Sequence, residues 1–230
     1  MNITNMHTEF KLLMDKSDAA GAPNFLSLEI DRFLNAAIEK FITKRAFGNN
    51  PRRLGFEEDQ KRRDDLRELV GTYSISIEDT GEDDDNKPNG VFVELPEDYR
   101  HAINEEGTMT IGEVDHRVGI KPITHDRYNK IINDPFNKPN KKSLYRLDVA
   151  KAEDSNAGRV EIIIPAGYKL STYMLRYLKT HVKVDKTDSV DCNLAEHTHR
   201  EIVRMAVVEA LQNVEDPRYQ SGKIELNELE

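Results

Sequence analysis

Cys192, His197 and His199 come closest to a set of side chains that could do chemistry. A cysteine near a histidine can form a nucleophilic pair, and both residue types bind metal ions. The two histidines are two residues apart, so on a helix their side chains point roughly 200° apart around the axis and cannot face one ion. Nothing in the sequence supplies a third group to orient a Cys–His pair. We therefore expect no catalytic residue, no metal and no cofactor here.

The acidic run 78–85 is the second place where chemistry could reside, because carboxylates are calcium ligands. A frame that begins at Asp83 places Lys87 at its fifth position, where an EF-hand loop needs an oxygen ligand. We expect a solvated hairpin tip without a bound ion. The chain also lacks a Walker-type glycine loop, a Gly-x-Ser-x-Gly elbow and a dinucleotide fingerprint. The sequence favours a non-enzymatic protein, and an enzyme whose site is assembled from dispersed residues stays an alternative.

Basic residues are concentrated around one predicted interhelical loop, between residues 44 and 63. Such a cluster could bind DNA phosphates or the carboxylates of a neighbouring subunit. Acidic residues interleave with it, and the net charge of −9 argues against a general affinity for nucleic acid. A solvated or inter-subunit face and sequence-independent DNA binding both stay open. The candidate contact residues are Arg45, Arg52, Arg53, Arg62 and Arg63.

Composition limits the class of protein further. Hydrophobic residues make up 37% and charged residues 33%, which is polar for a folded protein but more apolar than a disordered one. The single cysteine excludes an intramolecular disulfide and fits assembly in a reducing cytoplasm. No segment approaches the ~18 apolar residues of a membrane span, and the N-terminus lacks the basic-then-apolar pattern of an export signal. We expect neither a membrane partner nor export by the usual routes.

Hydrophobic periodicity divides the chain into helical ends and a strand-rich middle. Apolar residues at spacings of three and four predict helices over 8–16, 28–46 and 194–214, and charge ordering predicts another over 56–70. Strands are predicted over 72–77, 91–95, 108–111, 117–123, 144–149, 159–164 and 169–177. A short helix is expected over 126–132, and turns are expected at 89–90, 106–107, 156–158 and 166–167.

The resulting fold class is α+β. The terminal helices form a helical bundle, with helix 28–46 packed on helix 194–214, and the middle forms a central β-rich lobe. We expect one subunit over 1–230, with a helical body over 1–71 and 192–216 and the β-rich lobe over 72–191. The C-terminal tail 217–230 has few apolar residues, so alone it should be disordered. On assembly, Ile224 and Leu226 could contact a neighbouring subunit as an edge strand or as apolar side chains laid on its surface.

The segment 133–140 predicts a stiff loop. Pro135 and Pro139 restrict the backbone, and the surrounding asparagines favour turns. A rigid loop that carries Phe136 and Lys138 suits docking against a neighbour. It could equally brace the strand 144–149, and both interpretations stay open.

Four blocks of the sequence resemble a structural protein of crAss-like and related tailed bacteriophages. They are VFVELPEDY at 91–99, VGIKPITHDRYNKIINDPFNKPNKKSLYRLD at 118–148, MLRYLKT at 174–180 and CNLAEHTHREIVRMAVVEAL at 192–211. In that family similar blocks occur in the same order, and the resemblance covers residues 25–214. Its members are ring proteins of the head-to-tail connector, similar in role to tail tubular or adaptor proteins.

The resemblance implies a structural virion protein that is assembled in the host cytoplasm. It implies a ring, usually twelve-fold, that lies below the portal protein, contacts the portal or neighbouring tail rings, and lets the genome pass without specific binding. It implies no catalytic residues.

Overall fold

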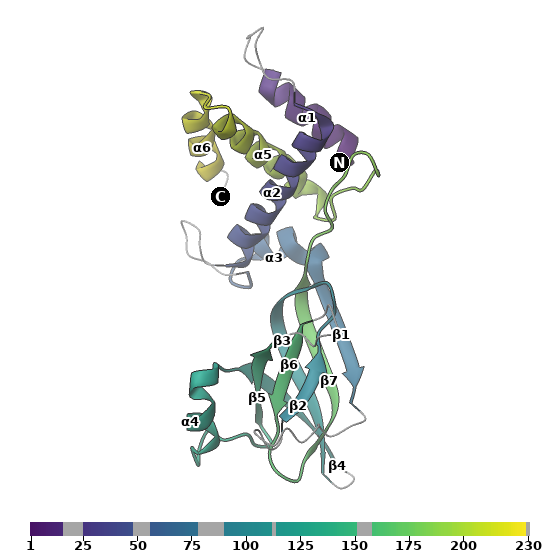
Figure 1. Ribbon diagram of the computed structural model, residues 1–230, viewed down its shortest axis with the longest axis vertical. Coiled ribbons are helices and arrows are strands. Elements are labelled where there is room, and N and C mark those ends of the chain that lie inside the picture. Colours follow the sequence, from purple (N-terminus) through teal and green to yellow (C-terminus); the bar gives the residue numbers. More distant parts are fainter. Residues whose placement is uncertain (16–24, 48–55, 78–89, 112–113, 151–157, 229–230) are drawn as a thin grey trace. The chain divides into compact units, whose positions relative to one another are not determined.

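The helices occupy the two ends of the chain and the strands its middle (Figure 1). The structure, a computed structural model, describes residues 1–15, 25–47, 56–77, 90–111, 114–150 and 158–228. The chain divides into a helical unit, Met1–Leu69 with His181–Glu230, and a sheet unit, Val70–Thr180. Residues 181–191, grouped with the strands in the sequence analysis, belong to the helical unit. The predicted α+β class, with helices at both termini and a central sheet, is confirmed.

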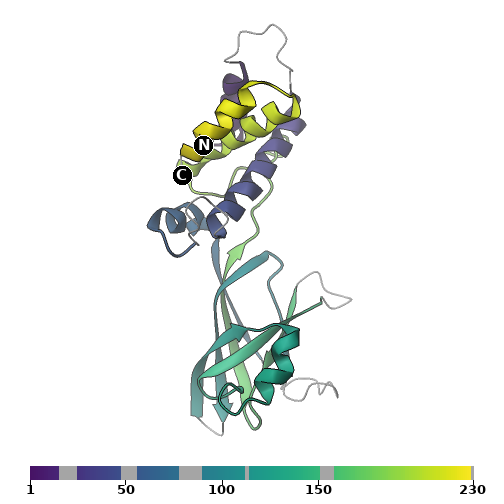
Figure 2. The ribbon, with the colours of Figure 1, turned by 90° about the vertical axis from the view of Figure 1, so that its left-hand side faces the viewer.

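The helical unit is organised around α5. Both α1 and α2 pack on α5, and α6 packs on it as well (Figure 2). The predicted stripe of α2 is buried at Ile38, Phe41 and Ile42, and α5 contributes Val203 and Ala206 to the same interior. The predicted packing of helix 28–46 on helix 194–214 is therefore confirmed. The helices are α1 (Ile3–Asp15), α2 (Ser27–Ala46), α3 (Gln60–Leu66), α5 (His199–Asn213) and α6 (Arg218–Glu228), with 3-10 turns at Arg67–Leu69 and Glu196–Thr198.

The predicted helix 56–70 is shorter in the structure. α3 begins after Asp59, whose side chain accepts a hydrogen bond from the backbone N–H of Lys61 at 3.2 Å. Such a cap fixes the start of a helix. At the other end α3 is followed by a 3-10 turn at Arg67–Leu69, and a strand begins at Val70, so the last predicted turn is not α-helical.

Residues 218–228 of the C-terminal tail form a helix, which corrects the expectation of disorder for this part of the chain. Asp216 accepts a hydrogen bond from the backbone N–H of Arg218 at 2.9 Å, and Pro217 lies directly before α6, where a missing N–H costs nothing. Gly222 and Leu226 line the side of α6 that faces α5. The alternation of polar and apolar residues over 223–226 was too short to distinguish a strand from a helix.

The sheet unit contains one curled seven-stranded sheet with the order β1-β7-β3-β4-β5-β6-β2 (Figure 1). Neighbours run antiparallel except β4 and β5, which are parallel. The strands are β1 (Val70–Ser76), β2 (Gly90–Glu94), β3 (Tyr99–Ile111), β4 (Val114–Pro122), β5 (Ser143–Val149), β6 (Arg159–Ile163) and β7 (Lys169–Lys179). Each predicted strand falls within or across one of these.

The two faces of the sheet bury apolar side chains in different ways. One face forms the main core of the unit, which includes Leu144, Ile162 and Tyr173. On the other face Leu147 and Ile163 pack against Ile131 and Ile132 of α4 (Tyr128–Ile132). Because successive strand residues point to opposite faces, this short helix is held by alternate residues of β5 and β6.

The predicted turn at 106–107 is wrong, because β3 runs through it. Gly107 pairs with Tyr173 of β7, and a Cβ atom at Gly107 would lie 2.9 Å from Cδ1 of Leu170. This glycine allows close packing within a strand. The predicted turn at 166–167 is confirmed, since Gly167 has φ of +82° and the N–H of Tyr168 donates to the carbonyl of Pro165 at 3.2 Å.

Two further expectations fall on residues outside the described ranges: the acidic run 78–85 and most of the turns at 89–90 and 156–158. Within the described ranges, none of the helices combines the length and apolar character that spanning a membrane requires.

Candidate functional site

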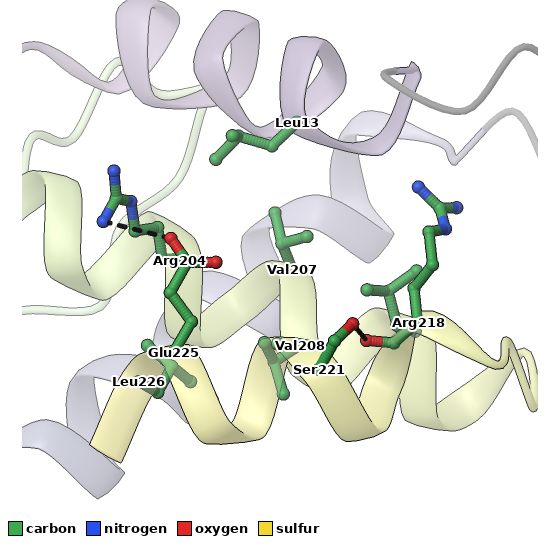
Figure 3. Close-up of a pocket in the computed structure, with 10 residues that line it drawn as sticks. Leu13, Arg204, Val207, Val208, Arg218, Ser221, Glu225 and Leu226 are labelled. Atoms are coloured by element: carbon green, nitrogen blue, oxygen red, sulfur yellow. Dashed lines mark hydrogen bonds and ion pairs between the residues drawn. The ribbon is translucent and has the colours of Figure 1, made fainter. Parts of the chain in front are cut away.

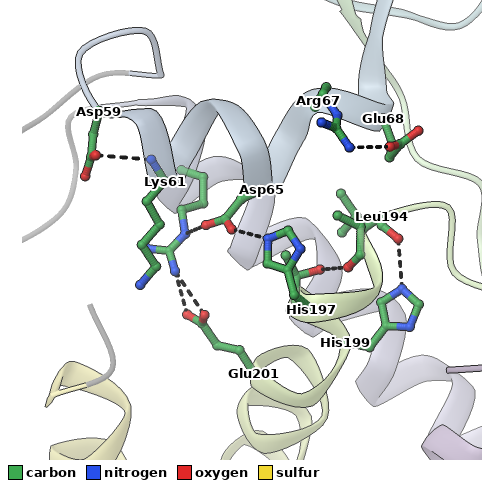
Figure 4. A network of polar contacts seen from close by, with 12 residues as sticks. Asp59, Lys61, Asp65, Arg67, Glu68, Leu194, His197, His199 and Glu201 are labelled. Carbon is green, nitrogen blue, oxygen red and sulfur yellow. Dashed lines mark hydrogen bonds and ion pairs between the residues drawn. The ribbon is translucent and has the colours of Figure 1, made fainter.

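The main charged cluster of the helical unit joins α2, α3 and α5 through Arg45. This side chain is 1% exposed. Its Nε lies 2.9 Å from Oδ2 of Asp65 in α3, and its Nη2 donates to both carboxylate oxygens of Glu201 in α5 at 2.9 and 3.0 Å. Oδ1 of Asp65 in turn lies 2.9 Å from Nε2 of His197 (Figure 4). One guanidinium group therefore connects carboxylates from two other helices.

Helix position explains why these charges meet. Arg45 lies in the last turn of α2 and Glu201 in the first turn of α5, where each charge opposes the end of its helix dipole. Arg62 of α3 donates to the carbonyl of Lys44 at 3.1 Å, so it binds the C-terminal end of α2. Phe41 places its ring 5.0 Å from Cζ of Arg45.

The basic region of the sequence is thus divided by the structure. Arg45 and Arg62 are buried within the helical unit, so they present no charge to a neighbouring molecule in this structure. Arg63 is exposed on α3. Arg52 and Arg53 lie outside the described residues.

A hollow of about 300 Å³ borders this cluster, and its walls include Lys61, Arg200 and Arg204. The arginines already have carboxylate partners: Nε of Arg200 lies 3.1 Å from Glu9, and Nη1 of Arg204 lies 3.7 Å from Glu225. These pairs reduce the positive potential that an anion would meet in the hollow.

Cys192, His197 and His199 do not form a catalytic or metal-binding set, and the two histidines have separate partners. His199 is buried, and its Nε2 lies 2.9 Å from the carbonyl oxygen of Leu194, whereas His197 contacts Asp65 (Figure 4). Burial raises the pKa of the Cys192 thiol, which disfavours the thiolate. Among the described residues, no three or more His, Cys, Asp and Glu side chains are placed to hold one metal ion.

The crossover between β4 and β5, residues 123–142, holds the most exposed large apolar side chain of the described chain. Phe136 is 87% exposed. The loop around it is fixed by Asp134, whose Oδ1 accepts from the N–H of Phe136 at 2.9 Å and whose Oδ2 accepts from Nδ2 of Asn137 at 2.7 Å. Pro135 and Lys138 are exposed, and Pro139 is half-buried. The stiff exposed loop expected at 133–140 is present.

A groove of about 260 Å³ lies beside α6, on the side that faces α5 (Figure 3). Leu13, Val207 and Leu226 contribute its apolar walls. Ile224 is 62% exposed and does not line this groove. The two tail residues proposed as contacts therefore have different environments, because a helix turns them to different sides.

The chain was compared with known protein families and with curated proteins. The family model described as phage tail ring protein 3/4 matches residues 1–216. The chain belongs to this family. No curated protein matches the chain. The match covers the sheet unit and the helical unit as far as the end of α5, and α6 lies beyond it.

Membership of the phage tail ring protein 3/4 family confirms the resemblance drawn from the four sequence blocks. The protein is a structural component of the phage tail with a ring role, in a family that is not a class of enzymes. In a ring protein the side chains that matter are those that hold the subunit together and those that face a neighbour.

Two buried polar pairs that hold the subunit together were not predicted from the sequence. Glu105 of β3 contacts Arg146 of β5 inside the sheet unit, and burial raises the pKa of Glu105 to about 7 although Arg146 opposes the shift. His7 of α1 lies 2.7 Å from Asp31 of α2, and burial lowers the pKa of His7 although Asp31 opposes that shift. Asp31 follows Ile30 and lies on the buried apolar stripe of its helix. A charged residue in such a stripe is the signal from which this buried pair could have been predicted.

Proposed function

We propose that this chain forms a ring in the head-to-tail connector, below the portal protein, through which the phage genome passes. The family match over residues 1–216 carries the proposal, because it gives a tail ring role to almost the whole chain. The connector position extends that role on the strength of the four sequence blocks. We propose twelve copies and contacts with the portal or with neighbouring tail rings.

The charge of the protein supports a lumen that DNA can slide through. Each subunit carries a net charge of −9, so a ring of such subunits repels duplex DNA instead of binding its phosphates. Two of the arginines that could have attracted DNA phosphates are not at the surface, since Arg45 and Arg62 are buried in ion pairs and hydrogen bonds of the helical unit. This observation disfavours the alternative, a sequence-independent DNA-binding protein that uses residues 45–63.

We propose that contacts between subunits or between rings are made by exposed residues. In a cyclic ring one face of the subunit meets a different face of the next, so contact residues need not be contiguous. The candidates that the structure leaves exposed or partly exposed are Arg63, Pro135, Phe136, Lys138, Pro139, Ile224 and Leu226.

Cryo-electron microscopy of purified particles tests the proposal. We expect a reconstruction of the connector without imposed symmetry to show a twelve-fold ring. The helical unit and the sheet unit should each fit its density when they are placed as separate bodies. A chain that is absent from particles, or that forms a ring only at the distal end of the tail, would contradict the connector position. A ring with another copy number would contradict only the twelve-fold symmetry.

A mobility-shift titration separates the ring role from the DNA-binding alternative. We expect no salt-dependent shift of duplex DNA by the purified protein at low micromolar concentration. A shift that weakens steeply with added salt would favour DNA binding through phosphate contacts.

A further inference from the structure

The last two residues of β4 and the β4–β5 crossover, together residues 121–142, form a basic surface on an acidic protein. Residues 121–142 contain six basic and two acidic residues, a net charge of +4, so the remainder of the chain carries −13. All six basic side chains are exposed: Lys121, Arg127, Lys130, Lys138, Lys141 and Lys142.

The crossover presents Phe136 in a fixed position. The N–H of Lys138 donates to the carbonyl of Asp134 at 3.0 Å, and the N–H of Lys142 donates to Oδ1 of Asn140 at 2.8 Å. Together with the two bonds to the Asp134 carboxylate, these contacts hold the loop from 134 to 142. At its base α4 is packed on β5 and β6 by Ile131 and Ile132. Little conformational entropy is left to lose when the loop binds, which favours its use as an anchor.

The chemistry of this surface indicates a protein partner and not duplex DNA. An exposed aromatic side chain on a segment rich in exposed cations has the chemistry of the centre and rim of a protein interface, where the ring enters an apolar pocket and the rim forms ion pairs. Phosphate binding would use the lysines, but it would leave Phe136 exposed and unused.

We propose that the β4–β5 crossover docks on the adjacent copy of this chain, with Phe136 in an apolar pocket and the exposed lysines of the same surface against carboxylates. Two observations favour a second copy. The rest of each subunit supplies an excess of thirteen negative charges for a surface that carries four positive ones. In a ring of identical subunits the crossover of one copy meets a different face of the next, so both halves of the contact can come from one sequence. The inference rests on the ring role and is independent of the connector position.

Site-specific photocrosslinking tests the partner. Cys192 is the only cysteine and is buried, so a Cys192→Ser background leaves Phe136→Cys as the single thiol for a benzophenone maleimide. After irradiation with an excess of unlabelled full-length chain, we expect a crosslinked homodimer whose partner peptide contains Asp or Glu side chains. Val114→Cys in the same background is the matched control, since Val114 is an apolar residue 56% exposed in the same unit. No homodimer, or equal yields from positions 136 and 114, would overturn the inference.

Charge reversal tests the lysine rim. Lys138→Glu/Lys141→Glu/Lys142→Glu should weaken self-association, measured by analytical ultracentrifugation, by at least about tenfold, and added salt should reduce the difference. The control Lys11→Glu/Lys169→Glu/Lys183→Glu makes the same change of charge at exposed positions outside the crossover and should leave self-association within about twofold of wild type. Equal weakening by both sets would show that net charge alone governs association.

Irradiation of labelled subunits in assembled particles separates this inference from the proposed function. A crosslink from position 136 to a different tail protein would overturn docking on a second copy and leave the connector ring intact. A homodimer crosslink from a ring found away from the connector would support docking on a second copy and overturn the connector position.

Discussion

Arg45 shows at the scale of the residue how this subunit keeps charge inside its helical unit. A lone guanidinium group in the interior would lose several kcal/mol of hydration. Here two carboxylates and the Phe41 ring surround it. The same logic holds for Glu105 and Arg146 in the sheet unit, so each unit has its own buried ion pair.

Substituting Arg45 should destabilise the helical unit strongly. Arg45→Met leaves Asp65 and Glu201 without their shared cation, and breaking a buried pair on one side costs about 3–5 kcal/mol. The free energy of unfolding from urea titration measures this. Arg63→Met, at an exposed position of α3, is the control and should change it by less than about 0.5 kcal/mol. A loss below about 1 kcal/mol for Arg45→Met would show that the network is dispensable.

Glu105 should make stability fall with rising pH. Its pKa is about 7 in the folded protein against an ordinary value of 4.5, so between these values the folded state holds a proton that the unfolded chain has released. The contribution is fully present below pH 4.5 and is lost as pH rises through 7, by at most about 3 kcal/mol. The other oxygen, Oε2, is buried and accepts no hydrogen bond from the described residues, which favours the protonated form.

The Glu105→Gln variant isolates this effect. The free energy of unfolding of wild type minus that of the variant, measured by urea titration, should fall between pH 5 and pH 8, because the variant lacks the titrating group. Other titrating groups, including His7, contribute equally to both proteins and cancel. A difference that does not change with pH would mean that Glu105 is ionised throughout.

Sequence patterns predicted which residues are apolar and buried more accurately than which charges are buried. Arg45 follows Phe41 by four positions and therefore continues the buried stripe of α2, yet the adjacent Lys44 and the other basic residues up to position 63 made this region resemble a charged surface. The partners could not be predicted, because Asp65 and Glu201 lie on other helices and depend on tertiary packing. Phe136 was predictable as exposed, since two prolines and several asparagines already indicated a stiff loop.

At the scale of the element, α2 shows that residues at the same helical spacing can differ in burial. Phe33 and Phe41 both lie at the apolar spacing that predicts this helix, but Phe41 is 1% exposed whereas Phe33 is half-buried. Phe33 stacks with Phe10 at 6.3 Å between ring centroids and meets Phe25 edge-on at 5.5 Å. One ring belongs to the interface with α5 and the other to an aromatic cluster at its margin.

The two phenylalanines should therefore differ in their contribution to stability. Phe41→Ala should cost about 3–5 kcal/mol because it leaves a cavity in the core, and Phe33→Ala should cost less because its ring is partly solvated. Urea unfolding of both variants shows which loses more free energy of unfolding, and Leu28→Ala is an exposed control on the same helix. Equal losses at positions 33 and 41 would contradict the assigned burial.

The helix α6 is the element that the sequence analysis did not predict, and Gly222 tests its packing on α5. A Cβ atom at Gly222 would lie 2.9 Å from Cγ2 of Val208, so Gly222→Ala should be neutral or destabilising in the wild type. In a Val208→Ala background the contact is relieved, and the same substitution should stabilise by about 0.5–1 kcal/mol because alanine is the better helix former. A double-mutant cycle measures the coupling. No coupling between the two positions would show that α6 does not pack here.

At the scale of the whole molecule, the sheet unit is an insertion in the helical unit. The helical unit is built from both ends of the chain, and the sheet unit is the continuous segment between them. Val70 of β1 pairs with Leu178 of β7, so the chain enters and leaves the sheet unit through neighbouring strands. An inserted segment whose ends are adjacent can fold without constraining its host.

Each unit should therefore fold without the other. Residues 70–180 expressed alone keep their core and the Glu105–Arg146 pair, so we expect one cooperative urea transition and the pH dependence assigned to Glu105. The complementary protein, with 70–180 replaced by a short Gly/Ser linker, keeps α1, α2 and α5 in contact, so it should retain the sensitivity to Arg45→Met. Since the β4–β5 crossover belongs to the sheet unit, this second protein should lose the self-association that depends on Phe136. A fragment 70–180 that unfolds without cooperativity would mean that its core depends on the helical unit, and the chain would then be a single folding unit.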